Sequence, residues 1–314
     1  MARTMRQQLS MQVIKSARGM LANTPVQKWP VTTLIYRKVF RFGYTADELT
    51  TDFRGIKLTI PTKDTTIVPG LVGGFYEKIE LDVFELLAEQ SRVILDVGGS
   101  IGDYTCVGAN RLPADGHIVA FEPIPENQAY IKKNLEQNQL TSKATVAPVA
   151  VGDRDAEIDI YMVEGSVGTH SAAATSAAGV STKSVHVPVV MLDSYVVENK
   201  LANIDILKID VEGYDGFVLK GAQQLIRKFK PTMFIEFVAD NLKNCGFDPN
   251  EFLVLLKGGY KHIYMVDEPR GILKRCNDQD LARLTTHSMN ANLILSDRAA
   301  HITTINTFLT KSKA

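Results

Sequence analysis

The sequence predicts an α/β protein with a doubly wound, mostly parallel sheet and a helical N-terminal extension. Three observations indicate this class. Short apolar runs typical of buried strands alternate with helical patterns from about residue 93 onward. A glycine-rich turn follows the first of these runs, and an acid, Glu122, ends the second. A chain of 314 residues, 45% of them hydrophobic, is long enough to bury the core of such a sheet.

The first fifty residues are predicted to form the extension. A helix is expected over residues 5–22, because an apolar face recurs at helical spacing through Leu9, Val13, Ala17, Met20 and Leu21. Prolines then interrupt the chain, and a second short helix is expected over 31–41. Residues 1–46 hold eight Lys or Arg and no acid, although the whole chain is neutral. This asymmetry suits either peripheral contact with an anionic membrane or packing on the protein's own acidic surface.

The remaining elements follow from periodicity and chain breakers. Residues 53–70 are expected to form a β-hairpin with loops, and residues 80–89 a helix. Strands are then expected at 93–97, 117–121, 145–151, 204–209, 232–237, 260–266 and 291–296. Helices are expected at 102–111, 126–138, 213–229 and 249–257. Extended segments at 157–163 and 185–190 flank a Ser- and Ala-rich loop, 166–184, that has no apolar period and is expected to be mobile.

The glycine turn, D-V-G-G-S-I-G at residues 96–102, carries the strongest chemical signal. Glycines after a strand let the backbone approach a ligand, and an acid at the tip of the next strand suits ribose hydroxyls. The spacing departs from the dinucleotide pattern G-x-G-x-x-G. Because Asp96 precedes the glycines, it would repel a pyrophosphate and suit a positive amino group. This favours S-adenosylmethionine over a dinucleotide, and a nicotinamide-dependent dehydrogenase is the second enzymatic interpretation.

A second polar motif, K-I-D-V-E, ends the strand predicted at 204–209. Lys208, Asp210 and Glu212 are two residues apart, so they face one side of the extended chain, where ligands bind in open α/β sheets. The alternative is that the two acids only cap the next helix. Glu236, on the following strand, is expected beside Asp210. These three carboxylates could hold a divalent cation, but an ion pair or a helix end is favoured for Glu236, and no metal is expected.

The histidines, the cysteines and the hydropathy of the chain bear on the candidate bases, the state of the thiols and the compartment. His170 and His287 lie in predicted loops and are candidates for a general base, although solvated loop histidines are the favoured interpretation. Three widely spaced cysteines indicate reduced thiols. With no apolar run of bilayer length and no signal-peptide pattern, the chain is expected to be cytoplasmic, with a peripheral place at the inner face of the membrane as the alternative. No nucleic-acid partner is expected.

Seven segments together resemble FkbM-type S-adenosylmethionine-dependent methyltransferases. They are V-I-L-D-V-G-G-S-I-G-D-Y-T (93–105), A-F-E-P-I-P-E-N (120–127), V-A-V-G-D (149–153), M-L-D (191–193), L-K-I-D-V-E-G-Y-D (207–215), V-L-K-G-A (218–222) and P-T-M-F-I-E (231–236). In order and spacing the resemblance covers about residues 70–240. Gly99-Ser100 stands where the family often has Ala-Asn, a change between small residues.

The resemblance implies a class I, Rossmann-like methyltransferase domain at 51–300, with its core at 70–267, between the extension 1–50 and a C-terminal tail at 301–314. It implies S-adenosylmethionine as cofactor and a hydroxyl of a sugar, glycolipid or other small metabolite as acceptor. By position, the cofactor residues would be Asp96, Gly98, Ser100, Gly102, Glu122, Pro123 and Asp153. Of these, Asp96, Gly98 and Gly102 would face the methionine part and Glu122 the ribose, and residues 150–153 would lie by the adenine. Candidates for catalysis would be Asp210, Glu212 and His170. A membrane- or partner-docking protein that binds the cofactor without catalysis is the alternative from another class.

Overall fold

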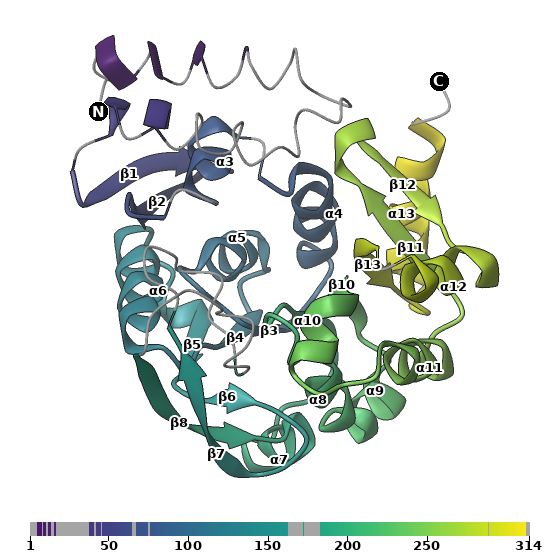
Figure 1. The fold of residues 1–314 in the computed structure, drawn as a ribbon. Helices are drawn as coiled ribbons and strands as arrows, with labels where there is room; N and C mark the ends of the chain where they lie inside the picture. The colour runs from purple at the N-terminus through teal and green to yellow at the C-terminus, as the bar shows by residue number, and fades with distance from the viewer. Residues whose placement is uncertain are drawn as a thin grey trace.

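The structure is a computed structural model that describes residues 5–7, 9–10, 12–13, 16, 38–40, 42–44, 46–64, 67–74, 76–162, 172, 183–287 and 289–311. Its centre is an eight-stranded sheet in the order β12-β11-β13-β10-β9-β3-β4-β5 (Figure 1). Five strands run parallel: β3 (Val93–Val97), β4 (His117–Phe121), β5 (Ala144–Ala147), β9 (Ile204–Ile209) and β10 (Thr232–Val238). The predicted α/β class with a mostly parallel sheet is therefore confirmed.

The far edge of the sheet is antiparallel. There, β13 (Asn290–Leu295) is inserted between β10 and β11 (Ile263–Asp267) and pairs antiparallel with both. β12 (Ile272–Arg275) closes this edge and follows η3 (Glu268–Arg270). The last strand in the sequence thus lies inside the sheet, which the alternating pattern alone did not indicate.

Helices cover both faces of the sheet because the buried strands are apolar on both sides. Ile94, Ile118 and Ile206 pack with one set of helices: α4 (Lys78–Ala88), α5 (Asp103–Arg111) and α6 (Pro125–Gln137). Leu95 and Leu207, one residue further along their strands, face the opposite set. That set comprises α7 (Leu192–Glu198), α8 (Asp215–Lys220), α9 (Gln223–Phe229), α10 (Ala239–Asn244), α11 (Pro249–Gly259) and α12 (Asp278–Thr286).

Two predicted elements are divided in the structure. The strand expected at 145–151 ends at Ala147, and after η2 (Thr141–Lys143) and β5 the chain enters a second sheet through β6 (Ala150–Val151). That sheet has the order β6-β8-β7, with β7 (Ala156–Tyr161) and β8 (Ser184–Val190) antiparallel. The helix expected at 213–229 is α8 and α9, separated at Gly221, where a Cβ would lie 1.9 Å from the carbonyl oxygen of Gly152.

The hairpin and the C-terminal helix complete the fold. β1 (Glu48–Phe53) and β2 (Ile56–Pro61) form a hairpin slightly earlier than predicted, and α3 (Val68–Gly73) follows. Both residues of its turn have positive φ, 50° at Arg54 and 83° at Gly55, as two-residue hairpin turns require. The described part of the predicted tail, residues 301–311, is helical and belongs to α13 (Ala299–Lys311), which packs on α4 and β12. No helix among the described ranges is long and apolar enough to cross a bilayer.

Candidate functional site

A cavity opens where β3, β4 and β9 end and the loops after them meet. This is the edge at which doubly wound sheets bind ligands. Six of the predicted site residues line it, two from each loop: Gly98, Ser100, Glu122, Pro123, Asp210 and Glu212. The structure therefore brings the glycine turn, the acid after β4 and the acids after β9 to one cavity.

The glycine turn lies directly against the end of β9. Gly98 has φ +90°, and a Cβ there would be 2.0 Å from the carbonyl oxygen of Asp210, so only glycine allows this approach. The amides of Gly98 and Gly99 donate to the Phe121 carbonyl at 3.0 and 3.1 Å. These contacts hold the turn between the ends of β4 and β9, with its backbone in the cavity wall.

Glu122 ties the glycine turn to the loop after β4. One carboxylate oxygen, Oε2, accepts from the Ser100 amide at 2.8 Å, and the other, Oε1, accepts from the Ile124 amide at 2.8 Å. Burial raises the pKa of Glu122 to about 7, although the two backbone donors act in the opposite direction. A side-chain hydrogen bond from Asn127 also acts to lower this pKa. Because an ionised carboxylate has about four acceptor sites, Glu122 can still accept from a ligand hydroxyl.

The rest of the cavity wall is mainly apolar. Ala150 and Val151, from the segment predicted to lie near an adenine, line it. The three-stranded sheet adds Ile158 and Ile160 from β7, and Tyr214 lines the cavity after β9. A flat, apolar group can be buried here next to the Glu122 carboxylate.

Other predicted residues lie elsewhere. Among the described residues, the cavity lining does not include Asp96, Gly102 or Asp153. Asp96 is fully buried, and its Oδ2 accepts from the Thr105 hydroxyl at 2.6 Å. Gly102, with φ +87°, precedes α5 and packs on Ile131. The roles of these three in cofactor binding stay predictions, and His170 lies outside the described residues.

Lys208 is a buried cation among carboxylates. It pairs with Asp96 across β3 and β9, and its Nζ lies 3.9 Å from Asp96 Oδ1 and 3.3 Å from Asp210 Oδ2. It also lies 4.6 Å from the centre of the Tyr104 ring, and the Tyr104 hydroxyl donates to Glu77 at 2.8 Å. Burial acts to lower the pKa of Lys208, but the surrounding carboxylates, led by Asp210 and Asp96, together outweigh it and raise the pKa. Lys208 therefore stays charged and holds Asp210 at the cavity edge.

The N-cap residue of α8 is Tyr214, so neither Asp210 nor Glu212 occupies the cap position considered for them. Asp215, the first residue of the helix, binds backbone amides of the loop before it. The Asp215 carboxylate accepts from the amides of Gly213 at 3.0 Å and Val211 at 3.4 Å. Glu212 has the left-handed φ of 51° and accepts from the Asn241 side chain at 3.2 Å. Burial raises its pKa to about 8, with Asp210 and Asp215 adding to the shift. Such strain at a cavity edge is typical of functional residues.

Glu236 lies on β10, next to β9 as predicted. Burial first, and then Asp210, raise its pKa to about 9. Within the described part of the chain, no group of three or more His, Cys, Asp or Glu side chains is placed to hold a metal ion. His287 caps the C-terminal end of α12 and contacts the Thr286 hydroxyl at 2.9 Å.

Several site residues had no sequence signal. Ile158 and Ile160 reach the cavity from a separate small sheet, and Glu77 approaches Tyr104 from the start of α4. Tyr104 lies two residues after the glycine turn, so its position in D-Y-T could have drawn attention to it. For the others, the tertiary arrangement alone brings them to the site.

Comparisons with known proteins agree on one class. Residues 96–276 match the family described as Methyltransferase FkbM domain. The hexuronic acid methyltransferase AglP of Haloferax volcanii is 26% identical over 180 residues, which span 56% of this chain and 67% of that protein.

Solved structures are more distant. Methyltransferase FkbM of Methylobacillus flagellatus KT aligns with 75% of this chain and 55% of its own length, at 14% identity and a TM-score of 0.39. The O-methyltransferase TomG of Streptomyces achromogenes, solved with S-adenosylmethionine, aligns with 69% of this chain and 79% of its own, at 12% identity and a TM-score of 0.38. At these TM-scores neither likeness bears on the acceptor.

Proposed function

Because the chain belongs to the FkbM methyltransferase family, we propose that it transfers a methyl group from S-adenosylmethionine to a hydroxyl of a sugar or glycolipid. The family match confirms the resemblance predicted from the sequence, together with methyltransferase activity and S-adenosylmethionine as cofactor. The hydroxyl and the sugar are the proposal. The relative AglP acts on a hexuronic acid, which supports a sugar acceptor.

The single observation that carries the proposal is the continuity of one cavity from Glu122 to Asp210 and Glu212. The residues present fit the cofactor. Glu122 would hold the ribose hydroxyls, the backbone at Gly98 and Ser100 would receive the methionine part, and the apolar wall would cover the adenine. The acceptor would then meet the acids after β9. The family match argues against the dehydrogenase alternative, whose cofactor would carry a pyrophosphate.

When bound, S-adenosylmethionine supplies a methyl group already activated on a sulfonium. The protein must then align the acceptor oxygen, a contribution that can reach about 7–11 kcal/mol. The acceptor hydroxyl must also lose its proton, which calls for a base. Glu212, with its pKa raised to about 8, is suited to take this proton. Asp210, held beside Lys208, would orient the hydroxyl.

The test is methyl transfer from labelled S-adenosylmethionine into the separated aqueous and lipid fractions of a cell extract, followed by identification of the labelled product. An ether methyl group survives mild alkali, whereas a methyl ester is hydrolysed. We expect an alkali-stable label on a sugar. Alkali-labile label would assign a carboxyl acceptor, and binding without any transfer would favour the docking alternative; either result would overturn the proposal.

Replacing Glu122 with glutamine should weaken binding of S-adenosylhomocysteine by about 1–3 kcal/mol, roughly fivefold to more than a hundredfold. A glutamine amide nitrogen would face one of the two backbone amides that now donate to the carboxylate, so a donor would meet a donor. Isothermal titration calorimetry measures the change.

The matched control is Glu126→Gln, four residues further along, where the acid is exposed and pairs with Lys63 at the surface. It should leave the affinity unchanged. The effect at Glu122 should not depend on a global loss of fold, which thermal unfolding of both variants would report. Equal affinities in the two variants would remove Glu122 from the cofactor site.

A further inference from the structure

The N-terminal segment turns large apolar side chains toward solvent. Its described residues between 5 and 16 are helical, and Met5, Leu9 and Val13 are 85%, 54% and 43% exposed. These residues are four apart, so they share one face of the helix. A surface helix ordinarily packs its apolar face on the protein and leaves its polar face in water, which is the opposite arrangement.

The contact with the protein is made by a small polar residue instead. Ser10 is buried, and its hydroxyl donates to the Val39 carbonyl at 2.6 Å. A Cβ on Gly43 would lie 2.6 Å from the Ser10 Cβ, so the two backbones are close. This contact determines which face of the helix is directed outward. At Leu9 and Val13, the predicted apolar face is therefore not packed on the protein's own surface.

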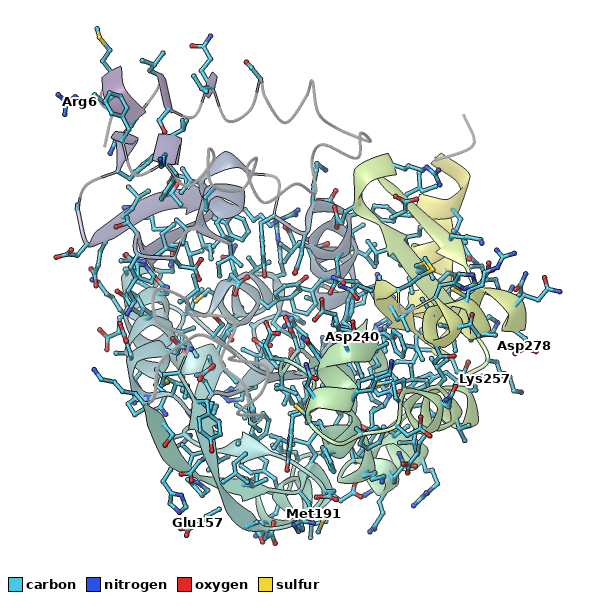
Figure 2. All side chains as sticks on the ribbon, in the orientation of Figure 1. Arg6, Glu157, Met191, Asp240, Lys257 and Asp278 are labelled. Atoms are coloured by element: carbon cyan, nitrogen blue, oxygen red, sulfur yellow. The ribbon has the colours of Figure 1, made fainter. Side chains whose placement is uncertain are left out.

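Positive charge accompanies the exposed apolar face. Phe42 is 54% exposed, and the Arg6 guanidinium lies 5.6 Å from the centre of its ring. Figure 2 shows Arg6 at the outer margin of the molecule, beyond the β1–β2 hairpin. The surrounding stretch, residues 1–46, has eight basic residues and no acid.

We propose that this face, formed by Met5, Leu9, Val13 and Phe42, docks the enzyme on an anionic lipid bilayer. Apolar side chains on a basic helix insert at the boundary of headgroups and acyl chains, while Lys and Arg bind anionic headgroups. A second copy of the chain fits less well, because a symmetric contact would oppose two basic segments that contain no acid. The proposal concerns where the enzyme acts and does not depend on which acceptor it methylates.

The experiment is co-sedimentation of the full chain with vesicles of phosphatidylcholine alone or mixed with phosphatidylglycerol, in low and high salt. We expect the protein to bind the anionic vesicles in low salt. Its binding to neutral vesicles, and its binding in high salt, should each be about tenfold or more weaker. The double variant Leu9→Gln/Val13→Gln should lose about tenfold or more of the binding to anionic vesicles.

The matched control is Val197→Gln/Val254→Gln, which changes two exposed valines on α7 and α11 and should bind as the wild type does. Stabilisation by S-adenosylhomocysteine should be the same in all three proteins, which separates this test from that of the proposed function. Equal binding to neutral and anionic vesicles would overturn the proposal. So would equal binding of the Leu9→Gln/Val13→Gln variant and the wild type. Sedimentation velocity in which the wild type is a dimer and this variant a monomer would assign the face to a second copy instead.

Discussion

Replacing Lys208 with methionine is expected to lower the free energy of unfolding by about 3–5 kcal/mol at neutral pH. The Lys208 ammonium compensates the charge of two carboxylates: it lies 3.3 Å from Asp210 and 3.9 Å from the fully buried Asp96. Methionine keeps the length and apolar packing of the stem but leaves these charges uncompensated. Urea unfolding at constant cofactor concentration measures the loss.

The sign of the pH dependence follows from Asp96. Burial raises the pKa of Asp96, and the charge of Lys208 acts to lower it. Removal of Lys208 would therefore raise the pKa of Asp96 further. A carboxyl whose pKa is raised in the folded state lowers the free energy of unfolding when the pH is above that pKa. This loss becomes smaller as the pH falls and the carboxyl takes up a proton. The deficit of Lys208→Met should therefore shrink as the pH falls from neutral toward mildly acidic values.

Two further variants separate charge from packing. Lys257→Met removes an exposed lysine whose partner, Asp278, is also at the surface (Figure 2), and should cost less than about 1 kcal/mol. Lys208→Met/Asp96→Asn removes both buried charges of one pair and should be more stable than Lys208→Met alone. If Lys208→Met is as stable as Lys257→Met, the buried lysine has no electrostatic role.

The strands were predictable because they are apolar on both faces. β3, β4 and β9 begin and end at the predicted residues, since a short apolar run between turn signals has few other stable solutions. The break after β5 was not, because the apolar pattern continues across Pro148 into β6. The insertion of β13 between β10 and β11 depends on long-range pairing, on which a local pattern carries no information.

Parts of the site that are close in sequence were predictable for a similar reason. Gly98, Ser100 and Glu122 line the cavity because the ends of neighbouring parallel strands meet at one edge. The side of the sheet that Asp96 faces was harder to infer. Val97 lines the cavity, whereas the pleat turns Asp96 toward Lys208 and Thr105. The resemblance placed Asp96 at the methionine part, and only its tertiary contacts reveal this ion pair.

Replacing Glu212 with glutamine is expected to lower the turnover number by about 10²–10⁴-fold, the usual contribution of a general base. Glu212 lines the cavity, keeps the strained φ of 51° and has its pKa raised to about 8 by burial and by Asp210 and Asp215. Glutamine keeps the shape and the acceptor oxygen for Asn241 but cannot take a proton. Affinity for S-adenosylhomocysteine should stay within about twofold, because the loss falls on the transition state.

The pH profile of turnover distinguishes a base from a positioning residue at this place. In the wild type, turnover should rise with pH to a plateau with a midpoint near 8, because only ionised Glu212 accepts a proton. Asp210→Asn removes a negative charge that raises the pKa of Glu212, so the midpoint should move to lower pH even though turnover falls with the lost alignment. In Glu212→Gln the rise should disappear. A rise that persists in Glu212→Gln with its midpoint unchanged would assign the proton to another group and leave Glu212 as a wall of the cavity.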